Sequence, residues 1–253
     1  MRMLAIAQNT FRESVRDKVL YVLLFFAAVA ILGSKALGWV SIGQDVKIMK
    51  DICLAALLVF GVLISIFVGT NLIYKEIDKR TLYTILARPV RRYEFILGKY
   101  LGLSFLLGLV TLIMAAVATA YIVSMGGTID SVFIWAVVLV YWELLLITAI
   151  AILLSVATSP ILGAIIVFCV FVLGHATRIL VDLPPQLDGT STKQIFEILY
   201  YVIPNLSNFN IRSEAANSVP VSLSYIGYAI GYGTAYAAML LGLASLAFEE
   251  KDV

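Results

Sequence analysis

Residues 131–157 read SVFIWAVVLVYWELLLITAIAILLSVA, an unbroken apolar run in which Glu143 is the only acidic or basic side chain. A helix of about 20 residues crosses a hydrocarbon core of roughly 30 Å, so this run is long enough to span a bilayer. It lacks the alternation of polar and apolar residues that a strand of a membrane barrel requires, whereas a helix pairs its own backbone groups in lipid. The run therefore predicts a transmembrane helix.

Six runs of this kind indicate an all-α integral membrane protein with six transmembrane helices, at residues 19–40, 51–74, 99–125, 131–157, 159–182 and 221–248. Of the 253 residues, 62% are hydrophobic and 13% charged, and the mean hydropathy is +1.00. A soluble domain is about half apolar and about a quarter charged. Because this chain has more apolar surface than a soluble core buries, residues 1–253 are predicted to form a single transmembrane domain.

The distribution of basic residues predicts the orientation of the spans. With the N-terminus inside, twelve of the 18 Lys and Arg residues fall on inner segments, five on outer segments, and Lys35 near the outer end of the first span. Inner loops of membrane proteins carry the excess of Lys and Arg. Both termini are therefore expected in the cytoplasm. The net charge of +2 is too small to indicate a nucleic-acid partner.

The N-terminal segment, residues 1–18, has the pattern of an interfacial amphipathic helix. Apolar side chains recur in it at helical spacing, at Leu4, Ala7, Phe11 and Val15. Such a helix lies in the membrane surface with its apolar face toward lipid, so membrane lipids are an expected partner. The alternative is a solvated tail, which would leave the apolar stripe unused.

Residues 183–220 are long for a connection between two spans. Ser191 and Gln194 form a capping-box pattern that opens a short helix, and Pro204 ends it. A second short helix is expected around 208–217. We interpret the segment as short outer cap helices that lie on the outer surface of the bundle before the last span.

Two stripes recur every fourth residue along the last span, one of small residues and one of tyrosines: Gly227, Gly231 and Ala235, and Tyr228, Tyr232 and Tyr236. The second span carries a similar small-residue stripe at Gly61, Ser65 and Gly69. Small residues allow close helix packing, the alternative being a ligand contact. The tyrosines either pack or line a cavity for an amphiphilic cargo.

Polar side chains inside the spans are further candidate functional residues. Glu143 lies in the middle of its run, where an acidic group is costly and suggests a function. It either holds a neighbouring helix or contacts a proton or cargo. His175 lies near the outer end of the fifth run and is the only histidine, so no metal site is expected. No catalytic residues are expected, because neither H-E-x-x-H nor G-x-S-x-G occurs.

Between the second and third runs, residues 74–94 read YKEIDKRTLYTILARPVRRYE. Asp78 or Thr81 is placed to cap a short helix, and Pro89 ends it. The helix carries an apolar patch inside a charged rim, at Leu82, Ile85 and Leu86. Such a surface is typical of a docking site. The alternative is a basic loop that only fixes the orientation of the spans, and charge does not separate the two.

The stretch from Glu76 to Lys99 resembles the coupling-loop signature of type-2 ABC transporter permeases. The family pattern runs from acidic residues through Thr-Leu and a second Leu to basic-Pro-Val-x-Arg and Leu-Gly-Lys. The matching residues here are Arg80-Thr81-Leu82, Leu86, Arg88-Pro89-Val90, Arg92 and Leu97-Gly98-Lys99. Gly174-His175 and the stretch 200–206 are similar to a bacterial subgroup of that family.

The resemblance implies the permease domain of a bacterial ABC exporter in the cytoplasmic (inner) membrane. Residues 75–98 would form its cytoplasmic coupling loop, with a coupling helix. Ten residues would contact the ATPase subunit: Glu76, Asp78, Arg80, Thr81, Leu82, Tyr83, Leu86, Arg88, Pro89 and Arg92. In this family two such ATP-binding subunits pair with two permease chains, as a homo- or heterodimer.

The same resemblance assigns ATP and magnesium to the partner subunit. This chain has no G-x-x-x-x-G-K-[ST] loop, so it is expected to bind no cofactor and to be no enzyme itself. The alternative is a secondary transporter or channel without an ATPase partner. Secondary transporters usually contain repeated halves, and no convincing internal repeat is evident in this sequence.

Overall fold

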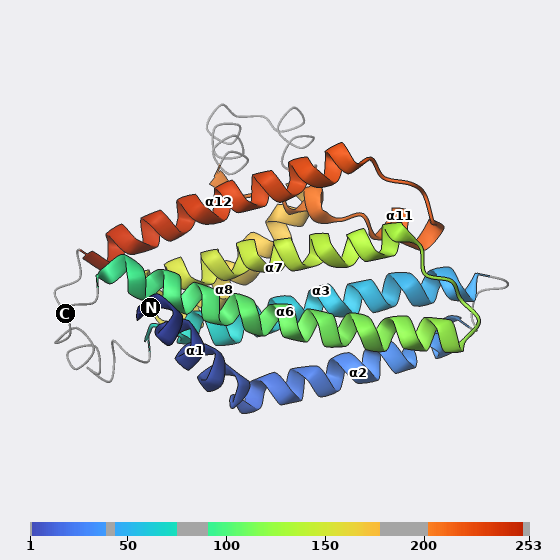
Figure 1. The fold of residues 1–253 in the computed structure, drawn as a ribbon, viewed down its shortest axis with the longest axis horizontal. Helices are drawn as coiled ribbons and strands as arrows, with labels where there is room; N and C mark the ends of the chain where they lie inside the picture. The colour runs from blue at the N-terminus through green and yellow to red at the C-terminus, as the bar shows by residue number, and fades with distance from the viewer. Residues whose placement is uncertain (1, 39–43, 75–90, 178–201, 250–253) are drawn as a thin grey trace, which may run out of the picture.

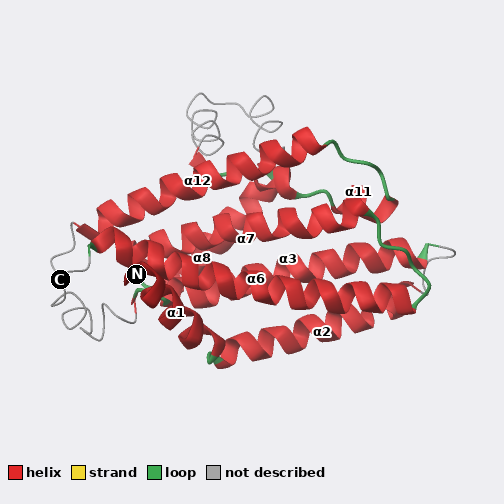
Figure 2. Ribbon diagram, viewed as in Figure 1, coloured by secondary structure: helices red, strands yellow, loops and turns green. Residues whose placement is uncertain are grey.

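A computed structural model describes residues 2–38, 44–74, 91–177 and 202–249, and every regular element in these ranges is a helix. The helices run largely side by side along one long axis (Figures 1 and 2). Their bounds are α1 Arg2–Val15, α2 Lys18–Gly38, α3 Asp45–Asn71, α6 Arg92–Ser124, α7 Ser131–Ala157, α8 Pro160–His175, the 3-10 helix η2 Leu206–Phe209, α11 Arg212–Asn217 and α12 Leu223–Glu249. This confirms the all-α prediction.

Four of the described helices, α3, α6, α7 and α12, are long and apolar enough to cross a membrane. Two shorter apolar stretches accompany them, Lys18–Ser34 within α2 and Pro160–His175. The helices begin and end differently from the apolar runs. α6 starts at Arg92 rather than at residue 99, because Glu94 accepts a hydrogen bond from the Arg91 N–H and closes the first turn. α8 ends at His175, before the predicted residue 182.

The core lies around α7, which packs against α3, α6, α8 and α12. Its contact with α3 is close because the small residues of α3 face it. Gly61 lies against Leu144, Gly69 lies against Ala151, and the Thr148 hydroxyl lies 3.3 Å from Ser65 Oγ. The small-residue stripe of the second span is therefore a packing stripe, as predicted.

The corresponding stripe of α12 behaves differently. Gly227 and Gly231 meet nothing within 4 Å in the described part of the chain. The close approach is made instead by Gly233, where an added Cβ would lie 2.7 Å from the ring of Phe209. α12 buries the face that contains Ile226, Ala229 and Gly233, so the predicted glycine face has no packing partner among the described residues.

A polar clamp joins three elements at the end of the bundle opposite the two termini. Lys50 Nζ of α3 lies 2.8 Å from Asp130 Oδ2, directly before α7, and Ser218 at the end of α11 donates to the same oxygen. Lys50 is 3% exposed. The hydrogen bonds from Lys50 and Ser218 hold the pKa of Asp130 below its ordinary value.

The clamp predicts a pH-dependent contribution to stability. Because the pKa of Asp130 is lower in the folded protein, its carboxylate stabilises the fold above its ordinary pKa, and this contribution is lost as the pH falls through the lowered value. We expect Asp130→Asn to lower the melting temperature at about pH 7, and the difference from wild type to shrink below about pH 4. Asp51→Asn, an exposed residue of α3, is the control. An equal difference at both pH values would contradict the clamp.

The α3–α7 contact predicts a specific effect of adding one methyl group. At Gly69 a Cβ would lie 2.8 Å from Ala151 Cβ, which cannot rotate away. We expect Gly69→Ala to lower the free energy of unfolding by about 1–3 kcal/mol for overpacking, offset by about 1 kcal/mol of helix propensity. Gly242→Ala meets nothing within 4 Å and should leave stability unchanged or higher. Thermal unfolding in detergent compares them, and equal melting temperatures would refute the contact.

Candidate functional site

The predicted coupling residues from Glu76 to Pro89 lie outside the described residues. Arg92 is described, and so are the two ends that flank the segment, Tyr74 and Arg91. The described residues at its two ends show which helices the segment is attached to.

The first anchor joins the end of α3 to α7. The backbone N–H groups of Ile73 and Tyr74 both donate to Ser155 Oγ, at 3.1 and 3.2 Å. Ser155 is 1% exposed, and Ile73 is fully buried. The chain therefore enters residues 75–90 from a point that is fixed to the core helix.

The second anchor joins the start of α6 to the end of α12. Arg92 Nη1 donates to the carbonyl oxygens of Phe248 and Glu249, at 2.6 and 2.7 Å. The last carbonyls of a helix have no partner within it and carry partial negative charge, so a guanidinium stabilises them. The rings of Phe95 and Phe248 stack below, 5.6 Å apart. The predicted contact of Arg92 with the ATPase subunit stays a prediction. In the structure Arg92 links the start of α6 to the end of α12.

The Leu97-Gly98-Lys99 end of the motif seats α1. A Cβ on Gly98 would lie 2.8 Å from Ile6, and a Cβ on Gly102 would lie 2.5 Å from the carbonyl oxygen of Ala7. Lys99 is 1% exposed, and its Nζ is 3.9 Å from Glu13 Oε2. The sequence does carry a signal for this contact, because Gly98 and Gly102 are four residues apart, a spacing that allows a second helix to approach closely. The prediction did not use this spacing.

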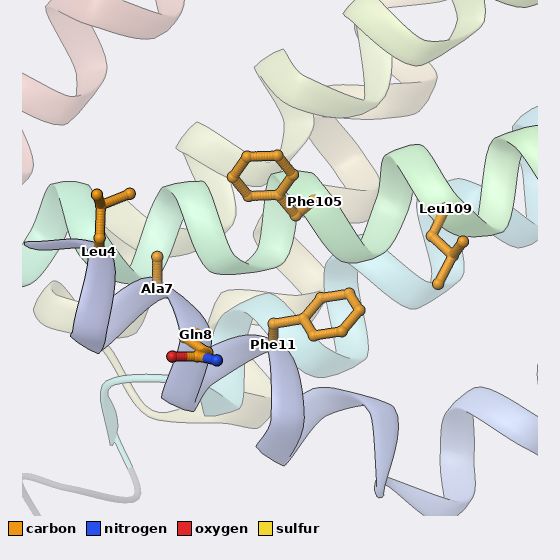
Figure 3. Close-up of a pocket in the computed structure, with 6 residues that line it drawn as sticks. All are labelled: Leu4, Ala7, Gln8, Phe11, Phe105 and Leu109. Carbon is orange, nitrogen blue, oxygen red and sulfur yellow. The ribbon is translucent and has the colours of Figure 1, made fainter.

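α1 uses its predicted apolar stripe along α6. An apolar groove of about 530 Å³ lies between the two helices, lined by Leu4, Ala7, Gln8, Phe11, Phe105 and Leu109 (Figure 3). Leu4 and Phe105 are 62% and 64% exposed. Ala7 is buried and Phe11 lines the groove beside α6, whereas Leu4 stays exposed, so only part of the stripe packs against this helix. The location of α1 in the membrane surface stays a prediction.

A second region, which we call the polar centre, lies where α8 ends. α8 runs antiparallel to α7 and stops at His175, opposite Glu143 in the middle of α7. Figure 1 shows α8 ending partway along the bundle. A helix that ends there leaves carbonyl groups without intrahelical partners, which lipid cannot satisfy.

Each of these carbonyl groups has a partner. Val172 and Leu173 accept from the N–H of Ala176, and Gly174 accepts from Thr177 Oγ1 at 2.6 Å. His175 accepts from Ser207 Oγ at 3.1 Å. The cap is therefore shared between the end of α8 and the returning segment that contains η2.

The tyrosines of α12 hold the returning segment, residues 202–209. The Tyr232 hydroxyl accepts from the N–H of Asn205 at 2.9 Å. The Tyr236 hydroxyl donates to the carbonyl of Val202 at 2.6 Å. The Tyr225 hydroxyl donates to the carbonyl of Asn208 at 3.0 Å. Backbone N–H and carbonyl groups outside a regular α-helix need hydrogen-bond partners in an apolar region. The hydroxyl groups of these tyrosines supply them.

Buried Glu143 faces half-buried His175 in the polar centre. Glu143 is 1% exposed, and its Oε1 lies 3.4 Å from His175 Nε2, without the geometry of a hydrogen bond. His175 Nδ1 lies 3.2 Å from the carbonyl of Phe171, which only accepts, so Nδ1 carries a proton. If Glu143 were ionised and Nε2 carried no proton, a lone pair of the carboxylate oxygen would face the lone pair of Nε2, and the two atoms would repel each other. We therefore expect one proton to be shared between the two groups, which would keep the pair neutral.

The structure thus brings together some of the predicted intramembrane residues. Glu143 with His175, and Tyr232 with Tyr236, lie in or beside the polar centre, while Tyr228 is 67% exposed and apart from it. A cavity of about 230 Å³ between α6, α7 and α12 is lined by Trp142 and Thr234, among others, and by none of the stripe tyrosines of the described chain. Among the described residues, no three His, Cys, Asp or Glu side chains gather as metal ligands.

Comparison with known families gives one match that covers nearly the whole chain. Residues 4–253 match the family described as ABC-2 family transporter protein. No curated protein matches the sequence.

The shared proton expected in the polar centre predicts opposite results for two changes at one position. Glu143→Gln places an amide N–H where the protonated carboxyl group would donate to Nε2, so we expect nearly wild-type thermal stability. Glu143→Ala removes the whole buried carboxyl group that faces Nε2 and opens a cavity, which should cost about 2–4 kcal/mol. Thermal unfolding with size-exclusion chromatography compares the variants. Equal losses for Gln and Ala would show that the pair does not share a proton in this way.

Proposed function

Because the chain belongs to the ABC-2 transporter family and is a multi-pass membrane permease of an ABC transporter, we propose that it is the pathway-forming half of an exporter. In this proposal a separate ATPase subunit binds ATP and magnesium and contacts residues 76–94. The permease hydrolyses nothing itself. Closure of the ATPase subunits on ATP moves the spans between inward-facing and outward-facing arrangements.

One observation supports this coupling most directly. The two ends of residues 75–90 are fastened to different helices, the first to α7 through Ser155 and the second to α12 through Arg92. A force applied to this segment therefore acts on α3 and α7 at one end and on α6 and α12 at the other. A loop with only a topogenic role does not require such anchors.

The proposal includes six spans with both termini in the cytoplasm. α2 and α8 add to the four long helices, and α8 crosses only about half of the bundle. Residues 202–222 then complete the fifth crossing, from the polar centre to the clamp at Lys50 and Ser218. The predicted outer cap segment covers residues 183–220, of which 183–201 lie outside the described residues. Residues 202–209 form hydrogen bonds with α8 and α12.

A complete pathway in this proposal needs a second permease chain and two ATPase subunits. The open face of α12 at Gly227 and Gly231 supports a second chain, because small residues allow close approach of another helix. Mass spectrometry of the purified partners distinguishes a second copy of this chain from a different permease chain. Export from the bacterial inner membrane is part of the same proposal.

A channel or secondary transporter is the alternative. It would need no ATPase subunit, and transport would follow an ion gradient rather than ATP. ATP-stimulated transport in vesicles that contain the chain with its purified partners separates the two mechanisms.

Substitutions in the predicted apolar patch test the coupling. We expect Leu82→Asp or Leu86→Asp to abolish co-purification of the ATPase subunit, because a carboxylate would have to be desolvated in the contact. The tagged chain is purified from native membranes, and partners that contain a Walker A sequence are quantified by mass spectrometry. Membrane insertion should be unchanged.

Arg12→Asp supplies the control, since Arg12 is an exposed residue of α1 outside the segment. It should retain the partner at the wild-type level. Normal recovery of the partner with Leu82→Asp and Leu86→Asp would remove the segment from the mechanism.

A further inference from the structure

A polar pocket lies at the elbow between α1 and α2, where it meets the end of α3. Its volume is about 210 Å³, and its polar lining consists of Glu13, Ser14, Arg16, Asp17 and Asn71. It is separate from the apolar groove of Figure 3, which is lined by α1 and α6. Most of the surface of a membrane helix bundle is apolar, so a pocket with this lining needs an explanation.

One side chain of the pocket is buried without a partner. Ser14 is 2% exposed, and its Oγ has no hydrogen-bond partner among the described residues. Buried hydroxyl groups in proteins are nearly always hydrogen-bonded. The hydroxyl of Ser14 can therefore bind an acceptor or donor that enters the pocket.

The charges of the pocket have both signs. The carboxylates of Glu13 and Asp17 lie on the same short stretch as the guanidinium of Arg16. Asp17 Oδ1 already accepts from the N–H of Val19 at 2.9 Å and so caps α2. A ligand that carries one anionic and one cationic group would match this arrangement, whereas a purely anionic ligand would face two carboxylates.

The position of the pocket indicates where such a ligand comes from. α2 begins at Lys18 and enters its apolar stretch at once, so the elbow lies at the level of the lipid headgroups. The groups available at that level are the phosphates of phospholipids and the amines attached to them.

We propose that this pocket binds the headgroup of a phospholipid that carries a phosphate and a primary ammonium group, as in phosphatidylethanolamine. The phosphate accepts from Arg16 and the Ser14 hydroxyl. The ammonium donates to Asp17 and to Glu13, whose Oε2 also lies 3.9 Å from Lys99 Nζ. A headgroup with a quaternary amine has no N–H to donate, and a glycerol headgroup has no cation.

The bound headgroup would join the α1–α2 elbow to the end of α3, since Asn71 and Leu72 also line the pocket. The end of α3 leads directly into residues 75–90. The lipid would therefore sit beside the root of the segment that the proposed function uses for coupling. Its binding does not depend on that function, because it can be measured without an ATPase subunit.

Native mass spectrometry of the full-length protein in detergent tests the proposal. The protein is mixed with phosphatidylethanolamine, phosphatidylcholine or phosphatidylglycerol of equal chain length. We expect one molecule of phosphatidylethanolamine to be retained in preference to the other two. Arg16→Gln and Asp17→Asn should each reduce its retention by roughly tenfold, because each removes a charge-assisted hydrogen bond. Asp17→Asn keeps an acceptor for the cap of α2 and so preserves the fold.

Arg12→Gln is the matched control, because Arg12 is an exposed arginine of α1 outside the pocket lining. It should retain phosphatidylethanolamine like wild type. Equal retention of the three lipids, or equal losses with Arg12→Gln and Arg16→Gln, would overturn the proposal. Binding of soluble phosphoethanolamine without retention of any lipid would also overturn it, since the ligand would then be a free metabolite.

Discussion

The structure depends on one constraint, which is that a helix end in lipid must find partners for its carbonyl groups. α8 ends at His175, opposite the middle of α7. Its last carbonyls are paired by Ala176, Thr177 and Ser207, and the returning segment is paired in turn by tyrosines of α12. The end of α8 is therefore paired with residues 202–209, and these residues are paired in turn with the tyrosines of α12.

α7 links this polar centre to both ends of the bundle. Ser155 at one end holds the backbone that leads into residues 75–90, Glu143 in the middle faces His175, and Asp130 at the other end holds Lys50 and Ser218. One helix thus contacts the anchor of residues 75–90, the end of α8 and the clamp. In a transporter driven from one side of the membrane, such a helix offers a continuous physical connection from the driven end to the far end.

Much of the fold could be predicted from the sequence, because long apolar runs leave no alternative to helices in lipid. The packing role of the α3 stripe at Gly61, Ser65 and Gly69 could also be predicted, because small residues at four-residue spacing allow another helix to approach closely. In the structure this stripe faces α7. The end of α8 was not predicted, because the run was extended to residue 182 across the polar residues His175, Thr177 and Arg178, whereas α8 ends at His175. The tyrosine stripe was visible, but its role depends on residues about 25 to 35 positions away, which helical periodicity does not reveal. The role of Gly98 in seating α1 was hidden inside a motif that was interpreted only as a coupling signature.

The depth of the returning segment is the most direct test of this account. Val202 is exposed and lies within that segment, while Val219 is exposed near the clamp. A spin label is placed at each position in turn, in a chain whose Cys53 and Cys169 are replaced by Ala, and its accessibility to oxygen and to a water-soluble nickel complex is measured in lipid vesicles. The account predicts that the label at 202 reports the hydrocarbon core and the label at 219 the membrane surface or water. Equal accessibility of both labels to the nickel complex would contradict it, because the returning segment would then lie outside the membrane.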